Sequence, residues 1–270
     1  MRGASRASLA DAKERLLTLT GGSSDAGRIG DELFAVVDLL DSQPPLRRAL
    51  ADDASAREAR KGLLTAILGS NVSPETAELL STVVTAHWST PGDLVDAIEQ
   101  LAVLAIVSQA DQAGHLDDLE DDLFRFARVV GSSPELRTAL GNPFAPADAK
   151  RELVRALLAD KATPAAIALI TQAALHPRGR SLDWSLAEYG RLAAELRERL
   201  IAEVRVADEL SAEQRSRLAA ALARAYGHEV HLNVVLDPAV IGGMIIRIGG
   251  EQIDGSVATR LADIRRRLVA

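Results

Sequence analysis

Glycine residues gather near the C-terminal end of the chain, in the segment DPAVIGGMIIRIGGEQIDGSVATRL at residues 237–261. Five of the 19 glycines lie there, beside apolar strand formers and ahead of an amphipathic helix. A glycine-rich loop between a strand and a helix often binds phosphate, because its backbone N–H groups converge on the anion. A P-loop also needs a lysine, however, and no lysine follows Lys161. The glycines form two pairs separated by a strand, which indicates a hairpin, and we expect Gly242 and Gly243 to allow a bulge or a close backbone approach.

The residue types that catalyse reactions or bind metals are absent or badly spaced. The chain has no cysteine, which excludes disulfides and thiolate ligands. His228 and His231 form one close pair, but residues three positions apart on a strand point to opposite faces. The acidic run at 117–124 contains Leu119 and Leu123 at helical spacing, so we expect its carboxylates to form a solvated helix face. We predict no catalytic residue, no metal site and no cofactor, and a chain that is not an enzyme by itself.

Charge and hydropathy limit the partners of the chain. The formal net charge is −7, whereas a nucleic-acid-binding protein needs a basic face, so we predict no nucleic-acid partner. The longest apolar run, Leu101–Val107, is too short to cross a membrane, and the first residues have the pattern of a helix and not of a signal peptide. We expect a soluble chain that reaches a membrane only through a partner. The arginine-rich last helix either meets an acidic partner or only stabilises its own C-terminal end, and the pattern leaves both interpretations open.

Most of the chain has the pattern of helices. Apolar residues recur every three or four positions over residues 5–199, and turn-forming residues interrupt them at short intervals. Ser73-Pro74 and Thr163-Pro164 each combine an N-cap residue with a first-turn proline, so we expect a helix to begin there. Aromatic residues make up only 3% of the chain, so the helices must pack through aliphatic side chains.

A shift of 90 residues brings two parts of the chain into register. The sequence LFAVVDLLDSQPPLRRAL at 33–50 lies over LFRFARVVGSSPELRTAL at 123–140, and several of the following leucines and a proline keep the same offset. Chance periodicity of leucines is the alternative, but it does not readily place both prolines and the Leu-Arg-x-Ala-Leu string at one offset. We therefore predict a tandem duplication of a helical bundle, with residues 1–100 as the first copy and residues 101–200 as the second.

The pattern changes after residue 200. The helix expected there begins with a capping box of Ser211 and Gln214. The predicted elements are strands at 200–208 and 228–237, a hairpin turning at Gly249-Gly250, and helices at 211–227 and from Ser256. The predicted fold class is therefore mostly α, with helical bundles followed by a small β-α-β-β-α module of the α+β type at residues 201–270.

The end of the chain resembles the C-terminal signature of the δ subunit of bacterial F-type ATP synthases, whose mitochondrial counterpart is the oligomycin sensitivity-conferring protein. The signature combines Asp-Pro, Ile-Gly-Gly, a strand ending in Arg-x-Gly, Ile-Asp-Gly-Ser and a helix with Arg-Leu. Its positions in this chain are Asp237, Pro238, Ile241, Gly242, Gly243, Arg247, Gly249, Ile253, Asp254, Gly255, Ser256, Arg260 and Leu261. A family member of ordinary length corresponds to about residues 95–270. The additional N-terminal segment resembles the long actinobacterial form, with a duplicated helical domain.

The resemblance implies a non-catalytic stator subunit in the peripheral stalk of the proton-translocating ATP synthase. Such a subunit links the N-terminal helices of the α subunits in the catalytic head to the b-type stalk subunits, so that the torque of the rotor is resisted during ATP synthesis. The resemblance also implies one copy per complex, at the cytoplasmic face of the bacterial cell membrane, without direct insertion into the membrane.

Family members bind their partners at two places, which implies two surfaces on this chain. An α-subunit helix binds in a groove of a helical bundle, whereas the C-terminal module meets the b-type helices. In the second copy the expected groove residues are Leu104, Val107, Ile167 and Ile170. The sequence leaves open which copy binds α. A free-standing helical scaffold or regulatory protein with a similar module is the alternative function.

Overall fold

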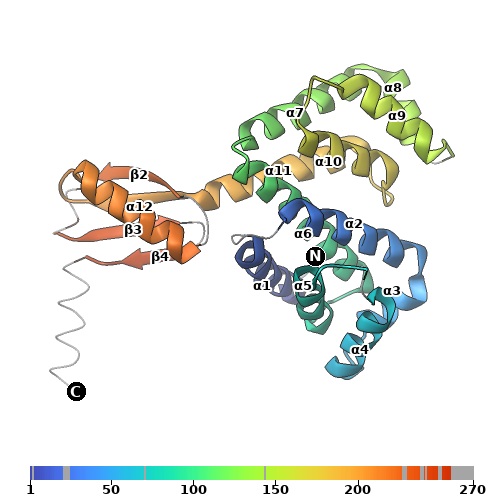
Figure 1. Ribbon diagram of the computed structural model, residues 1–270, viewed down its shortest axis with the longest axis horizontal. Coiled ribbons are helices and arrows are strands. Elements are labelled where there is room, and N and C mark those ends of the chain that lie inside the picture. The colour runs from blue at the N-terminus through green and yellow to red at the C-terminus, as the bar shows by residue number, and fades with distance from the viewer. Residues whose placement is uncertain are drawn as a thin grey trace. The chain divides into compact units, whose positions relative to one another are not determined.

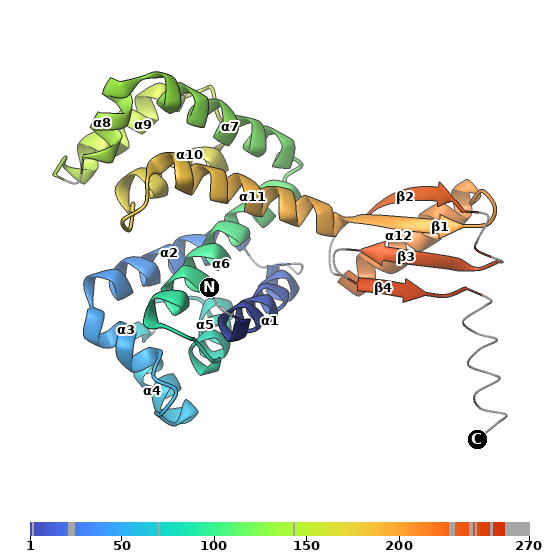
Figure 2. The ribbon, with the colours of Figure 1, turned by 180° about the vertical axis from the view of Figure 1, so that it is seen from behind.

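The structure, a computed structural model, describes residues 1, 3–20, 25–69, 71–142, 144–226, 230–237, 240, 242–248 and 251–256. The chain divides into two compact units, Met1–Ala194 and Glu195–Ala270. The first unit is built of helices, and the second contains a mixed sheet with a helix (Figures 1 and 2). The predicted fold class, mostly α with a small α+β module, is confirmed.

The first unit consists of helices joined by short connections. They are α1 (Gly3–Thr20), α2 (Ala26–Ser42), α3 (Pro44–Leu50), α4 (Arg57–Leu68), α5 (Pro74–Thr85), α6 (Pro91–Gln112), α7 (Leu116–Ser132), α8 (Pro134–Gly141), α9 (Ala147–Leu158) and α10 (Pro164–Leu175), followed by α11 (Leu182–Leu200). The predicted starts of α5 and α10 are confirmed. Ser73 Oγ accepts a hydrogen bond from the backbone of Thr76 at 3.3 Å, and Thr163 Oγ accepts one from Ala166 at 3.2 Å.

The helices repeat at the same offset as the sequence. The first series, α2 to α5, begins at residues 26, 44, 57 and 74, and the second series, α7 to α10, begins 90 residues later at 116, 134, 147 and 164. The core repeats as well, since Leu33 and Leu123 are both buried, as are Leu79 and Leu169. Both series belong to one compact unit, and the division of the chain at residues 100 and 200 stays a prediction.

Helix α6 lies between the two series. It packs against the earlier helices α1 and α2 and against the later helices α7 and α10. Because helices surround it, its apolar run Leu101–Val107 is buried over the whole length. Among the described helices, none combines the length and the apolar composition that a membrane span requires.

A half-buried and a buried carboxylate bind the N-terminal ends of α5 and α10. Glu32 of α2 accepts a hydrogen bond from Ser73 N at 2.9 Å, and Asp122 of α7 accepts one from Thr163 N at 2.7 Å. A negative charge at this end of a helix interacts favourably with the free N–H groups and with the helix dipole. The expectation of a fully solvated acidic face at 117–124 is therefore wrong at Asp122, which is buried because it binds this N–H group.

Buried cations bind the opposite ends of the same two helices. Arg60 of α4 donates to Ala86 O at 3.3 Å, and Lys150 Nζ of α9 donates to Ala174 O at 3.1 Å. Burial lowers the pKa of the Lys150 ammonium, while the carbonyl groups at the end of a helix favour its charge. In both series, side chains of opposite charge therefore fix the two ends of one helix.

The second unit is a four-stranded sheet with a helix, α12 (Ala212–Tyr226). The strands are β1 (Ile201–Val206), β2 (His231–Leu236), β3 (Met244–Ile248) and β4 (Glu251–Asp254), in the order β2-β1-β3-β4. Strand β1 is parallel to β2 and antiparallel to β3, which pairs antiparallel with β4. The predicted capping box of α12 is confirmed, because Gln214 N donates to Ser211 Oγ at 3.2 Å and Ser211 N donates to Gln214 Oε1 at 2.8 Å.

Among the described residues of this unit, the core lies on one face of the sheet. Ala202, Val204 and Val206 alternate along β1 and are buried together with Leu222 of α12. The residues between them, such as Glu203, point to the opposite face, because side chains alternate along a strand. The module therefore keeps a polar sheet face outside its hydrophobic core.

We predict that Glu32→Gln destabilises the helical unit by about 1–2 kcal/mol near pH 7. Burial opposes the ionisation of Glu32, but hydrogen bonds from Ser73, Thr76 and Arg28 outweigh it and lower the pKa of this carboxyl. The carboxylate therefore stabilises the fold above the unfolded-state pKa, and this contribution disappears as the pH falls through the lowered folded-state pKa. Urea unfolding at several pH values measures the difference in unfolding free energy from the wild type, which should shrink on acidification.

Glu58→Gln is the control, since the Glu58 side chain is 86% exposed. A difference that stays constant down to about pH 3 would contradict the assignment.

Candidate functional site

Two glycines of the signature have backbone conformations that other residues rarely adopt. Gly242 and Gly243 precede β3 with φ angles of 132° and 79°. A Cβ atom on Gly243 would lie 2.5 Å from Gly255 O and 3.0 Å from Ser256 Cα. Gly255 N donates to Met244 O at 2.9 Å, so the chain that enters β3 lies against the chain that leaves β4. The predicted close backbone approach is confirmed at Gly243.

Two acidic residues of the signature make contacts that shape the backbone of the module. Asp237 N donates to Val206 O at 2.9 Å, which joins the chain after β2 to the end of β1. Asp254 Oδ1 accepts from Ser256 N at 2.9 Å, as in an Asx turn. Other predicted positions, namely Pro238, Ile241, Gly249, Arg260, Leu261 and His228, and with them the predicted hairpin turn and last helix, lie outside the described residues.

Charged side chains occupy the polar face of the sheet. The register places the signature residue Arg247 of β3 beside Glu203 of β1, and Arg205 lies on the same face. Arg205 Nε donates to the Glu203 carboxylate at 2.7 Å, whereas Arg247 is exposed. The signature residue Ile253 is also exposed, but it lies on the other face, opposite Ile246. This polar face suits a partner that carries charged side chains of its own.

The four residues of the predicted partner groove lie on α6 and α10, which pack against each other. Leu104, Val107 and Ile170 are buried, whereas Ile167 is half-buried and its neighbour Ala168 is exposed. The whole of α10 has the sequence PAAIALITQAAL and carries no charge. A partner helix would therefore meet Ile167 and Ala168 first. The contact of all four residues with a partner stays a prediction.

Helix α5, the counterpart of α10, has a more polar outer surface. The residues 90 positions before Ile167 and Ala168 are Ala77 and Glu78. Glu78 is exposed and forms an ion pair with Arg15 of α1. The apolar and uncharged outer surface is thus a property of α10 and not of both copies.

Large apolar side chains are also exposed in the second half of the helical unit. Phe124 on α7 is 64% exposed, whereas its counterpart Phe34 on α2 is only 7% exposed. Phe144, between α8 and α9, and Trp184, on α11, are exposed as well. Arginine side chains lie over two of these rings, with Arg128 5.9 Å from the Phe124 centroid and Arg180 4.5 Å from the Trp184 centroid.

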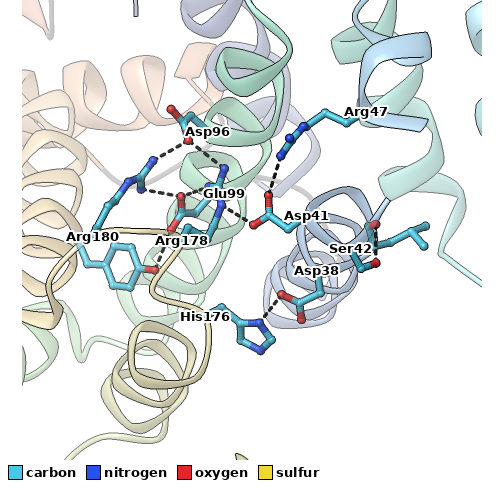
Figure 3. A network of polar contacts seen from close by, with 11 residues as sticks. Asp38, Asp41, Ser42, Arg47, Asp96, Glu99, His176, Arg178 and Arg180 are labelled. Atoms are coloured by element: carbon cyan, nitrogen blue, oxygen red, sulfur yellow. Dashed lines mark hydrogen bonds and ion pairs between the residues drawn. The ribbon is translucent and has the colours of Figure 1, made fainter. Parts of the chain in front are cut away.

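A partly buried ion network joins the segment before α11 to α2 and α6 (Figure 3). Arg178 contacts Asp41 at 2.6 Å, Asp96 at 3.0 Å and Glu99 at 2.5 Å. Arg180 contacts Asp96 at 2.5 Å and Glu99 at 2.8 Å. Burial opposes the charge of Arg178, but the three neighbouring carboxylates outweigh this effect and raise its pKa.

Further groups complete the network. Tyr189 of α11 donates to Glu99 Oε1 at 3.2 Å, and its burial together with this carboxylate raises the pKa of the phenol, which therefore stays protonated. His176 contacts Asp38 of α2 at 2.8 Å. The residue pattern did not predict this network. Glu99, two positions before the buried apolar run Leu101–Val107, was a signal, because a buried carboxylate needs cations nearby. The described residues contain no group of histidines and carboxylates arranged to hold a metal ion.

Comparisons with known proteins identify the relatives of the chain. The family model described as "ATP synthase delta (OSCP) subunit" matches residues 102–268. Proteins named ATP synthase subunit delta match over the full length. Those of Streptomyces griseus and Thermobifida fusca are 47% and 46% identical over 269 and 268 residues, which cover 99% of both chains in each case. The protein of Acidothermus cellulolyticus is 44% identical over 274 residues, or 100% of both chains.

We predict that Gly243→Ala destabilises the sheet module by about 2–4 kcal/mol, because the new Cβ atom would overlap the backbone at Gly255 and would hold a positive φ. Hydrogen exchange of the full chain, read by mass spectrometry, should show faster exchange in β3 and β4 and no change in α2 to α10. Gly62→Ala is the control, since Gly62 lies in helix α4 with open space around it. It should leave the stability unchanged or raise it by up to about 1 kcal/mol, because alanine is the better helix former. Unchanged protection of β3 in the Gly243 variant would contradict the close approach.

Proposed function

The chain belongs to the family of ATP synthase delta (OSCP) subunits, and we propose that it joins the N-terminal helices of the α subunits to the b-type stalk subunits. It is a non-catalytic subunit of the peripheral stalk of ATP synthase. The observation that carries the proposal is the similarity to proteins named ATP synthase subunit delta over practically the whole chain. Each of the two units then has one partner to bind.

The α-subunit helix binds to the second series of helices, along α10. The charge-free outer surface with Ile167 and Ala168 supports this choice, since an amphipathic helix docks through its apolar face. The residues beneath, Leu104, Val107 and Ile170, pack between α6 and α10 and keep the binding surface in place. In the first series, Glu78 occupies the corresponding position and already pairs with α1, so that surface is poorly suited to an apolar helix.

The b-type helices bind to the sheet module, on its polar face. Arg247 supports this choice, because it is an exposed member of the family signature outside the hydrophobic core. Glu203 and Arg205 next to it add charges of both signs, which suit a partner with alternating charges. Contacts of this kind give specificity and orientation more than affinity.

The proposed position of the chain follows from its partners. It lies at the cytoplasmic face of the bacterial cell membrane, as one peripheral copy per complex, and it is held there by the subunits that it binds. It takes no part in ATP hydrolysis. Its task is to prevent the catalytic head from turning with the rotor.

We predict that Ala168→Glu weakens the binding of an α-subunit N-terminal peptide about 10- to 50-fold, because the carboxylate would be desolvated under the docked helix. Isothermal titration calorimetry with the full-length chain measures the affinity. Glu78→Ala, the reverse change at the counterpart on α5, should leave the affinity unchanged. Equal weakening by Ala168→Glu and by Glu78→Ala would contradict the assignment of the binding surface to α10. A different result, no binding of the peptide by the wild type, would remove α as the partner. Loss of affinity only in the Glu78 variant would assign α binding to the first series.

We predict that Arg247→Glu weakens the binding of a C-terminal fragment of a b-type subunit about 5- to 10-fold at low salt, since it reverses a charge at the proposed contact. The difference should decrease as salt is added, because exposed charges are screened. Surface plasmon resonance with the full-length chain measures the rates, and the change should appear mainly in the association rate. Arg217→Glu, at an exposed position of α12, is the control. Equal effects of both variants would show that only the net charge matters and would exclude the polar sheet face as the contact.

A further inference from the structure

Helix α2 has an additional buried face that its counterpart α7 lacks. Gly27, Gly30 and Phe34 are all buried on α2. On α7, two acidic residues stand in place of the two glycines, and Phe124 is exposed. The two helices therefore match in the face that packs within their own series and differ in this second face.

The additional face of α2 packs directly on α6. A Cβ atom on Gly27 would overlap the Gln109 side chain. A Cβ atom on Gly30 would lie 2.7 Å from Ile106 Cδ1 and 3.1 Å from Ala102 O. The two helices can approach this closely only because both α2 positions lack a side chain. The glycines thus serve the close contact of α2 with α6. The helix itself does not need them, because glycine is unfavourable in a helix.

Ion pairs hold the other end of α2 (Figure 3). Asp41, in the last turn of α2, contacts Arg178 at 2.6 Å, and Arg178 contacts Glu99 of α6 at 2.5 Å. About one turn earlier, Asp38 contacts His176 at 2.8 Å. Helix α2 is therefore held on α6 by close packing at its beginning and by charges at its end.

The covered residues of α6 and the covering helix belong to different parts of the chain. Ala102, Ile106 and Gln109 lie within residues 102–268, which match the family model, whereas α2 lies outside that match. We propose that this face of α6 is a helix-docking face and that the chain fills it permanently with its own α2. The N-terminal segment then closes an interaction surface within the same molecule and adds no second free groove. This inference goes beyond the proposed function and does not depend on it.

The occupant defines the kind of helix that the face accepts. It is an amphipathic helix with the pattern Gly-x-x-Gly-x-x-x-Phe, in which the first glycine lies against the Gln109 side chain, the second lies against Ile106 and the Ala102 backbone, and the phenylalanine is buried. Because α2 is part of the chain, its effective concentration at the face is very high, and a free helix of the same kind cannot compete with it. Partner helices that approach α6 are therefore confined to the side of α10.

A labelled peptide of residues 25–42 tests whether the face is a docking face. Gly30→Leu in the full-length chain should displace α2 by steric overlap while it keeps the helix propensity of α2 high. In fluorescence anisotropy, this variant should bind the peptide at least about tenfold more tightly than the wild type does. Gly62→Leu is the matched control, since Gly62 lies in a helix with open space around it, and it should behave as the wild type does. A scrambled peptide should not bind. Equal peptide binding by all three proteins would overturn the proposal.

A cross-link tests the contact without any disturbance of the packing by a large side chain. The chain has no cysteine, so Gly27→Cys with Gln109→Cys creates one pair in an otherwise thiol-free protein. A short bismaleimide should join the two thiols within one folded molecule, which peptide mass spectrometry detects. Gly62→Cys with Gln109→Cys is the control pair and should stay unlinked. Absence of the first cross-link in a chain with the wild-type circular dichroism spectrum would overturn the docking of α2 on α6.

Discussion

The burial of one carboxylate determines how the helical unit is assembled. Glu99 lies in α6 and is only 5% exposed. An unpaired charge at such a place destabilises the fold by on the order of several kcal/mol. Arg178 and Arg180 neutralise it, and both come from the segment between α10 and α11. Because Arg178 also contacts Asp41 of α2, the neutralisation of one charge brings three distant parts of the unit together. Aliphatic packing around α6 supplies most of the burial, and the ion pairs add to the close packing at Gly27 and Gly30 in selecting one relative arrangement of these segments.

The two series of helices share the charged side chains that bind their helix ends, and they differ in their outer surfaces. Glu32 and Asp122 bind the starts of α5 and α10, and Arg60 and Lys150 bind the ends, so the sign of each charge is kept although the residue type changes. The sign of the charge at such a position is restricted, because each buried helix end needs a partner for its free backbone groups. The outer surfaces have no such restriction. They can become polar where a helix faces solvent and apolar where a partner docks, as the outer surfaces of α5 and α10 do.

Local rules made the elements of this fold predictable from the sequence, whereas distant pairings were not. The caps at Ser73 and Thr163 and the strands depend on neighbours in the sequence, and their patterns predicted them correctly. The contact between Glu99 and Arg178 joins residues 79 positions apart, and Asp122 binds an N–H group 41 positions later. No periodicity contains such information. The close approach at Gly243 was predictable because paired glycines before a strand have few other uses, but its contact at Gly255 was not.

The buried polar groups of the helical unit connect its helices to one another. A catalytic site keeps acids, bases and donors free to meet a substrate, often at the cost of stability. Here the buried Asp122 and Lys150 bind the ends of one helix, and Glu99 binds two guanidinium groups and a phenol. Each of these groups is engaged with another part of the same unit, so its interaction energy resists the separation of helices. Resistance to deformation is the property that a peripheral-stalk subunit needs, since it must bear a load while neither its covalent structure nor its fold changes.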